Sequence, residues 1–244
     1  MSVEIIDVRP GLWVWRQDHP DWHPEAGWDP PVSSTCVETR GEVILLDPLA
    51  PPEDADEFWA RLDARPPTMV VILKPDHVRD VDLFARRYGI PAFGPDVFHR
   101  GDMPETSLEW IGPGTQLPGG LQALYDGRGR NETPIWAPEQ RALVFADALT
   151  ERDGQLLVWG TDWHEERVLP ALRHLLELPF EVVIVAHGRP VHDRAAFERA
   201  LELPPFEEDG LTRFRWVSLN PVGYFSPSPS TRSTAMCAAQ MSAI

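Results

Sequence analysis

The chain has 244 residues, of which 43% are apolar and 25% charged, as is typical of a soluble globular protein. Its 38 acidic and 22 basic residues give a formal net charge of −16. This excess of acid argues against nucleic acid and against anionic lipid as partners, because both bind to basic faces. A small-molecule substrate or ligand is the expected partner, and the sequence does not define an oligomeric state.

No apolar run reaches the ~18 residues that would span a bilayer. The N-terminus, "MSVEIIDVRPG", has no basic segment followed by an apolar block. We therefore expect no membrane association and a cytoplasmic location. The two cysteines, Cys36 and Cys237, form no CxxC and no metal-ligand spacing, which argues against a disulfide framework and against a cysteine-based zinc site.

The first half of the chain alternates strands with two helices, which is typical of an α/β layer. Strands are predicted over 3–8, 11–16, 33–39, 42–47, 68–73 and 90–94. Helices are predicted over 52–65 and 79–89, the second ending at Gly89. Residues 17–31 form a long loop with two histidines, two tryptophans and four prolines. Loops of this length without secondary structure are often functional.

The second half begins with an irregular stretch over 95–120 that is rich in proline and glycine. Strands are then predicted over 121–126, 132–138, 141–147 and 181–188, with helices over 163–178 (interrupted by Pro170) and 193–203. After about residue 205 the pattern decays. We therefore predict one domain over 1–205 and a C-terminal extension over 206–244 that is a disordered tail.

Residues 70–84, "VVILKPDHVRDVDLF", hold the densest group of chemically useful side chains. A buried-type strand ends at Lys74, the only lysine in the chain, and Asp76, His77, Arg79 and Asp80 follow it. Ligands in α/β folds commonly bind at the carboxyl ends of strands. No GxSxG or GxGxxG is present, so a nucleophile elbow and a dinucleotide site are both unsupported.

The order of these elements resembles that of the metallo-β-lactamase superfamily, and the resemblance spans about residues 3–203. Four stretches carry it, namely "GEVILLDPL" (41–49), "VVILKPDHVRDVDLFARRYGIPAFG" (70–94), "RALVFADAL" (141–149) and "VVIVAHGRPV" (182–191). The resemblance implies a fold of the α/β (α+β) class. This fold is a four-layer αββα sandwich, with two sheets in the middle and helices outside. The resemblance also implies a metal centre at one edge of the sheets.

The superfamily's HxHxDH motif, set against residues 75–80, leaves His77 as the one retained histidine of the motif. On this comparison Pro75, Arg79 and Asp80 stand where the superfamily has other ligands. Asp76 and Asp80 are then the candidate catalytic carboxylates.

The remaining ligand positions lie in the second half. Asp147 matches the carboxylate that bridges two metals in the superfamily, and His187 matches the terminal histidine. The histidine that follows a glycine in the middle strands is best matched by Arg128, with Arg130 or Asn131 as alternatives. The resemblance implies that His77 and His187 serve different metals, so a standard dinuclear centre is incomplete.

Two hypotheses follow from these substitutions. In the first, Arg79 and Arg128 occupy the space of the metals, because a guanidinium cannot ligate zinc but can compensate nearby carboxylates. The protein is then a degenerate, non-catalytic or small-molecule-binding relative without zinc, and the arginine substitutions favour this reading.

In the second hypothesis, His77, Asp147 and His187 hold a single ion, at most one zinc. Asp76 and Asp80 are then further donors, and His19 or His23 helps from the 17–31 loop. The protein would then be a mononuclear hydrolase of ester, thioester, phosphoester or lactam substrates. The charge of Arg79 argues against this version.

Overall fold

The described residues, 3–98 and 101–207 of the computed structural model, form two main β-sheets. The larger sheet follows chain order through β1 (Glu4–Arg9), β2 (Leu12–Asp18), β3 (Pro31–Thr39), β4 (Glu42–Leu46), β5 (Met69–Val71), β6 (Ala92–Gly94) and β7 (Leu108–Trp110). Pairing is antiparallel from β1 to β4 and parallel from β4 to β7. The change of direction comes where the first crossover helix, α1 (Asp56–Ala64), joins β4 to β5.

The smaller sheet comes from the second half of the chain. Its order is β13 (Val182–Ile184), β10 (Ala142–Val144), β9 (Ile135–Ala137) and β8 (Gln122–Ala123), with β10 and β13 parallel. A separate hairpin is formed by β11 (Leu149–Arg152) and β12 (Gln155–Val158). The remaining helices are α2 (Val81–Tyr88), α3 (Leu169–His174) and α4 (Arg194–Ala200), with short turns η1 (Pro118–Gly120), η2 (His164–Val168) and η3 (Leu175–Glu177).

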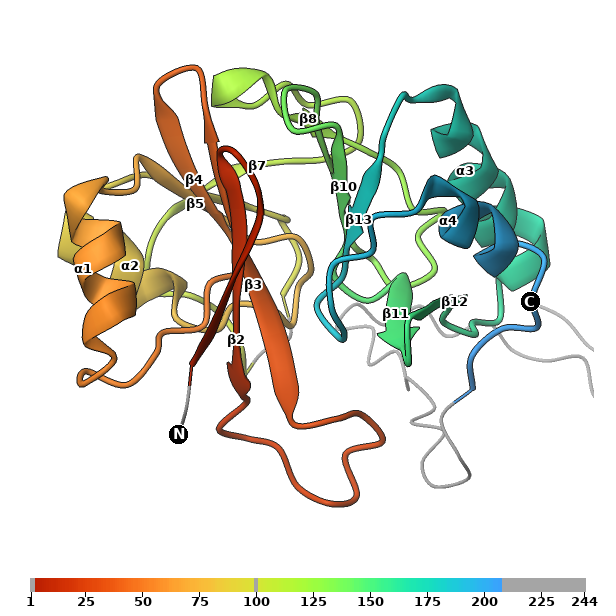
Figure 1. Cartoon of the computed structure of the whole chain (residues 1–244), viewed down its shortest axis with the longest axis horizontal. Coiled ribbons are helices and arrows are strands. Elements are labelled where there is room, and N and C mark those ends of the chain that lie inside the picture. Colours follow the sequence, from red (N-terminus) through yellow and green to blue (C-terminus); the bar gives the residue numbers. More distant parts are fainter. Residues whose placement is uncertain (1–2, 99–100, 208–244) are drawn as a thin grey trace, which may run out of the picture. The chain divides into compact units, whose positions relative to one another are not determined.

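Three apolar cores separate four layers. Alternation along β5 sends Val70 toward α1 and α2 and Val71 into the space between the sheets. Along β13, Ile184 joins the central core and Val183 packs toward α3 and α4. Figure 1 shows α1 and α2 on one side of the two sheets and α3 and α4 on the other. The predicted αββα sandwich is thus confirmed.

Two details differ from the sequence-based prediction. The β11–β12 hairpin was not predicted, although Asp153 and Gly154 both have positive φ at its tip and Asp-Gly is a strong hairpin signal. The helix predicted over 163–178 is divided into the π-turn η2, then α3, then η3. Pro170 lies in the first turn of α3, where its missing N–H is not needed.

The predicted C-terminal extension begins within the described residues. Phe206 bridges to Trp159, and its carbonyl accepts a hydrogen bond from Gly160 N at 2.8 Å. Residues 208–244 of the extension lie outside the described residues. No helix in the described ranges has the length and apolar character needed to cross a membrane.

Candidate metal centre

A group of polar side chains that includes the predicted His77, Asp147 and His187 gathers where strands of both sheets end. Asp47 follows β4, the Lys74–His77 segment follows β5, Asp147 follows β10 and His187 follows β13. Because β4 is parallel to β5 and β10 is parallel to β13, each pair delivers its polar ends to one edge of its sheet. The two parallel pairs thus bring four segments far apart in sequence to one place.

Asp147 is the centre of this group, and its two carboxylate oxygens face different kinds of atoms. Its Oδ1 lies 3.3 Å from His77 Nε2 and 3.4 Å from His187 Nε2. Its Oδ2 lies 2.6 Å from Lys74 Nζ and 3.9 Å from Arg130 Nη2. Asp147 is only 5% exposed. One side of the carboxylate therefore faces imidazole nitrogens and the other faces cations.

His77 is held from behind by a second carboxylate. Its Nδ1 lies 2.8 Å from Asp47 Oδ2, and Asp47 Oδ1 accepts a hydrogen bond from Leu73 N at 2.7 Å. Burial would lower the pKa of His77, but Asp147 and Asp47 outweigh it and raise this pKa to about 9. The pKa of His187 is lowered, because burial outweighs Asp147 there. Without a metal, these directions favour the charged form of His77 and the neutral form of His187 at pH 7.

Lys74 lies between two carboxylates. Its Nζ is 2.5 Å from Asp76 Oδ2 in addition to its contact with Asp147, and its side chain is 10% exposed. Burial acts to lower the pKa of this ammonium, but Asp147 and Asp76 raise it overall. In turn, although burial acts to raise the pKa of Asp147, Lys74 and His77 hold it well below its ordinary range. Lys74 and Asp147 therefore form a charged pair.

Arg79 is buried nearby but binds backbone oxygens. Its Nη1 donates to Asp47 O at 2.7 Å, to Ser33 O at 3.0 Å and to Ser34 Oγ at 3.3 Å. The guanidinium thus ties the end of β4 to β3. The first sequence-based hypothesis put the charge of Arg79 near Asp76, Asp80 and Asp147, and all three carboxylates interact with it electrostatically. The direct ion pair with Asp147 is made by Lys74.

Arg128 and Arg130 lie in the same loop, but only Arg130 contacts the site. Buried Asp126 shapes the loop by accepting hydrogen bonds from the backbone of Arg128 at 2.6 Å and of Arg130 at 3.4 Å. Arg130 reaches Asp147 and lies over the Trp159 ring, 4.7 Å from its centroid. Arg128 makes no ion pair with any described residue. Of the three candidates from the sequence, Arg128, Arg130 and Asn131, Arg130 is the one that pairs with Asp147.

The two candidate catalytic carboxylates, Asp76 and Asp80, have different partners. Asp76 pairs with Lys74 at the site. Asp80 points to the backbone, where its Oδ2 accepts a hydrogen bond from Ala50 N at 2.7 Å. Asp80 immediately precedes α2, so its position is that of a residue holding the helix start against the loop after β4.

Residues 27–187 match Lactamase_B, the metallo-beta-lactamase superfamily. The chain belongs to this superfamily. The resemblance inferred from four short stretches of sequence is therefore confirmed. A search of curated proteins gave no match.

Solved metallo-beta-lactamases share the fold along nearly their whole length. DIM-1 metallo-beta-lactamase is 14% identical with a TM-score of 0.61, over 83% of this chain and 97% of that one. A metallo-beta-lactamase from Erythrobacter litoralis is 17% identical with a TM-score of 0.62, over 82% and 95%. FIM-1 from Pseudomonas aeruginosa is 17% identical with a TM-score of 0.60, over 83% and 96%. At these identities the likeness concerns the fold alone.

The geometry changes how the superfamily's HxHxDH motif is set against this chain. If its Asp-His pair falls on Asp76 and His77, the second histidine falls on Lys74 and the first on Ile72. Three of these residues, Lys74, Asp76 and His77, meet at the site. Ile72 is fully buried between the larger sheet and its helices. The motif therefore spans residues 72–77, three residues earlier than the sequence comparison placed it.

The second correction concerns how the histidines are shared. The resemblance implied that His77 and His187 belong to different metals. Both Nε2 atoms instead lie within 3.4 Å of the same oxygen, Asp147 Oδ1. Together these three side chains are the one group of His, Cys, Asp or Glu in the described residues with the spacing of a metal site.

The three donor atoms have the spacing of a site for one ion. Tetrahedral ligands about 2.0–2.1 Å from zinc are roughly 3.3 Å apart, close to the two measured separations. Asp147 Oδ1 is buried and has no hydrogen-bond partner among the described residues, so its lone pairs remain available to a metal ion. The Oδ2 side offers an ammonium and a guanidinium, which have no lone pair to donate.

Glu132 is a further site residue that the sequence did not indicate. It is fully buried, and its Oε2 accepts hydrogen bonds from the backbone N–H groups of Asp147 and Ala148, at 2.5 and 2.7 Å. Burial, helped by Asp126 and Asp147, raises the pKa of Glu132 to about 8. A glutamate within a predicted apolar strand was the only available signal, and such a residue usually lies on a solvent face.

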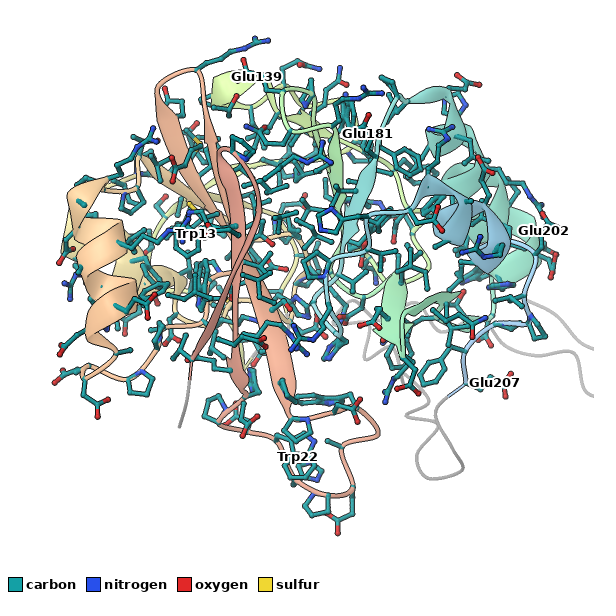
Figure 2. The ribbon with its side chains drawn as sticks, viewed as in Figure 1. Trp13, Trp22, Glu139, Glu181, Glu202 and Glu207 are labelled. Carbon is teal, nitrogen blue, oxygen red and sulfur yellow. The ribbon has the colours of Figure 1, made fainter. Side chains whose placement is uncertain are left out.

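Residues 19–30, which we call the covering loop, lie over the histidine side of the centre. The Trp28 ring packs against His187 with centroids 5.2 Å apart, and against His19 at 5.6 Å. Trp22 donates its Nε1–H to Trp28 O at 2.7 Å, and Figure 2 shows it near the outer end of the loop. The loop is thus attached to the site through Trp28.

The covering loop should loosen as the pH falls. Burial and Arg79 lower the pKa of His19 to about 4, with His77 and His187 adding to the effect and Asp21 opposing it. His19 Nδ1 also accepts a hydrogen bond from Asp21 N, which needs the neutral ring. A histidine with a lowered pKa stabilises the closed loop fully above about pH 6.5, and this stabilisation is lost as the pH falls toward 4.

We expect the fluorescence difference between wild type and Trp28→Phe to change between pH 6.5 and 4.5. In His19→Gln this change should be absent, whereas His23→Gln, at an exposed position of the same loop, should behave as wild type. An unaltered pH response in His19→Gln would contradict this assignment.

Proposed function

We propose that this protein is a metal-dependent hydrolase with a reduced centre, in which His77, Asp147 and His187 hold a single ion. The observation that carries the proposal is the convergence of both imidazole Nε2 atoms on Asp147 Oδ1. A single bound ion of this kind supplies an activated water and polarises a carbonyl or phosphoryl oxygen.

The surrounding residues support such a centre by fixing its ligands. Asp47 orients the ring of His77 so that Nε2 faces the site, an arrangement that raises the basicity of a ligating histidine. Glu132 holds the backbone of Asp147. Lys74 binds Oδ2 of Asp147, so that Oδ1 stays directed at the histidines. Trp28 covers His187 and limits the access of bulk water.

Two pockets adjoin the site and offer room for a small molecule. One, of about 410 Å³, is lined by His187, Arg16, Arg152 and Arg189 together with acidic residues of the β11–β12 hairpin. The other, of about 360 Å³, is lined by Asp76, Arg79 and His19. The covering loop contributes to both. We propose that the substrate is a small ester, thioester, phosphoester or lactam that enters beside this loop.

A second candidate is a metal-free protein that binds a small molecule without hydrolysing it. The observation that favours it is the pairing of Lys74 with both Asp147 and Asp76, because it neutralises the central carboxylate without any ion. An imidazolium at His77 would complete this arrangement. The two candidates differ in whether an ion enters on the Oδ1 side.

Metal analysis separates the candidates. We expect purified protein to hold close to one equivalent of zinc or manganese, and His77→Ala and His187→Ala to lower metal affinity by at least 10–100-fold while the fold is kept. Hydrolysis of generic ester and phosphodiester substrates should disappear in both variants. His164→Gln changes a buried histidine outside the cluster and should have neither effect. Folded wild-type protein that takes up no ion and hydrolyses nothing would favour the metal-free candidate.

A further inference from the structure

The two sides of Asp147 differ in charge as well as in chemistry. The Oδ1 side holds two nitrogen donors that can ligate a metal, whereas the Oδ2 side holds Lys74 and Arg130. When a carboxylate bridges two metals through its two oxygens, each oxygen faces an ion. Here only one of them can, because the groups on the other side are themselves cations.

We propose that Lys74, the only lysine in the chain, is a built-in replacement for the second metal ion on the Oδ2 side of Asp147, with Arg130 adding a second fixed charge. This inference shares its residues with the proposed function, but it does not require that an ion bind on the Oδ1 side.

The contacts of Lys74 match those of a small cation. Its ammonium lies within 2.6 Å of one oxygen from each of two carboxylates, Asp147 and Asp76, as a bridging ion would. An ammonium is a compact point charge on a flexible stem, whereas a guanidinium is a wide planar fork. All the other Lys or Arg positions of the sequence hold arginine. The single lysine therefore lies where the compact ammonium group fits between two carboxylates.

A divalent ion on this side would meet two obstacles. Protonated Lys74 has three donors and no acceptor, so it cannot become a ligand while it keeps its charge. An ion close to Oδ2 would also lie beside two positive groups, at a Coulomb cost that grows as the site is buried. The Oδ2 side is therefore closed to metal, and the centre is limited to one ion.

Restoring histidines on the Oδ2 side tests this inference. In the double variant Lys74→His/Arg130→His, two imidazoles replace the two cations beside Oδ2. We expect zinc binding, measured by titration and elemental analysis, to rise by one equivalent per chain relative to wild type. Each single variant should gain little, since one cation remains. Arg128→His paired with Lys74→His is the matched control, because Arg128 lies on the same loop and pairs with no described residue.

A second measurement uses the uniqueness of Lys74 and needs no variant to fold. Reductive methylation of the native, metal-free wild type should modify the N-terminal amine and leave Lys74 unmodified, whereas unfolded protein should be modified at both. Selective ¹⁵N-lysine labelling should give one slowly exchanging ammonium signal in the native wild type, and this signal should be lost when the protein is unfolded.

The outcomes separate this inference from the proposed function. A wild type that binds one equivalent of zinc per chain, or none, is consistent with an Oδ2 side that is closed to metal. Only the absence of zinc binding would contradict the proposed hydrolase. Two tight equivalents in the wild type would overturn the inference. So would a folded double variant that binds no more than wild type, or a Lys74 that is methylated in the native state as fast as the N-terminus.

Discussion

Replacing Lys74 by methionine should lower the free energy of unfolding of the metal-free protein by about 3–5 kcal/mol, the usual cost of removing one partner from a buried ion pair. Methionine fills nearly the same volume, so little of this loss comes from a cavity. The loss arises because Asp147 is only 5% exposed and its Oδ2 would keep a single cation nearby, Arg130 at 3.9 Å, while His77 faces the other oxygen, Oδ1. Urea unfolding in the presence of a chelator measures the change.

Two controls separate the buried pair from the exposed one. Asp76→Asn removes the other partner of Lys74. The side chain of Asp76 is 44% exposed, so this change should cost less than about 1 kcal/mol of stability. The double variant Lys74→Met/Asp147→Asn removes both buried charges and should recover much of the stability lost in Lys74→Met. If Asp76→Asn and Lys74→Met were equally destabilising, the pairing with Asp147 would not be the important one.

Replacing Glu132 by alanine should destabilise the protein by about 2–5 kcal/mol. Two buried backbone donors, Asp147 N and Ala148 N, would lose their common acceptor, and each unsatisfied donor costs about 1–3 kcal/mol. The change should also weaken zinc binding, because the backbone that presents Asp147 would no longer be held. Chemical denaturation and zinc titration report the two effects separately.

Glu132→Gln is the matched control for this prediction. Its side-chain carbonyl can still accept both backbone hydrogen bonds, so we expect it to lose far less stability than Glu132→Ala and to bind zinc nearly as wild type. Equal losses in the two variants would mean that the charge of Glu132, and not its role as an acceptor, stabilises the strand end.

The architecture was accessible from the sequence because it depends on patterns longer than one element. Alternation in "EVILLD" and "TMVVIL", helices that begin with acidic residues, and Gly89 after a helix each indicate one element. Their order indicated an α/β layer, and the four-layer αββα sandwich followed from the resemblance to the metallo-β-lactamase superfamily. The β11–β12 hairpin was missed although Asp153-Gly154 signalled it, because the segment was not read for turn chemistry.

The site was harder to predict because a shift of a few residues changes which side chains meet. His77, Asp147 and His187 were identified because each follows a strand in a recognisable segment. Lys74 was not assigned to the site, because the motif was set three residues too late and arginines appeared to fill the ligand positions. Whether a side chain at a strand end turns inward, as Lys74 does, or binds backbone oxygens, as Arg79 does, depends on contacts that sequence spacing does not encode.

The ammonium of Lys74 has one further consequence, for how the protein depends on its surroundings. A charge that belongs to a side chain is present as soon as the chain is synthesised, and neither dilution nor a chelator removes it. The positive charge on the Oδ2 side of Asp147 is therefore independent of the supply of metal. Metal starvation would then empty only the Oδ1 side, and it would leave the core of the domain folded and ready to be loaded again.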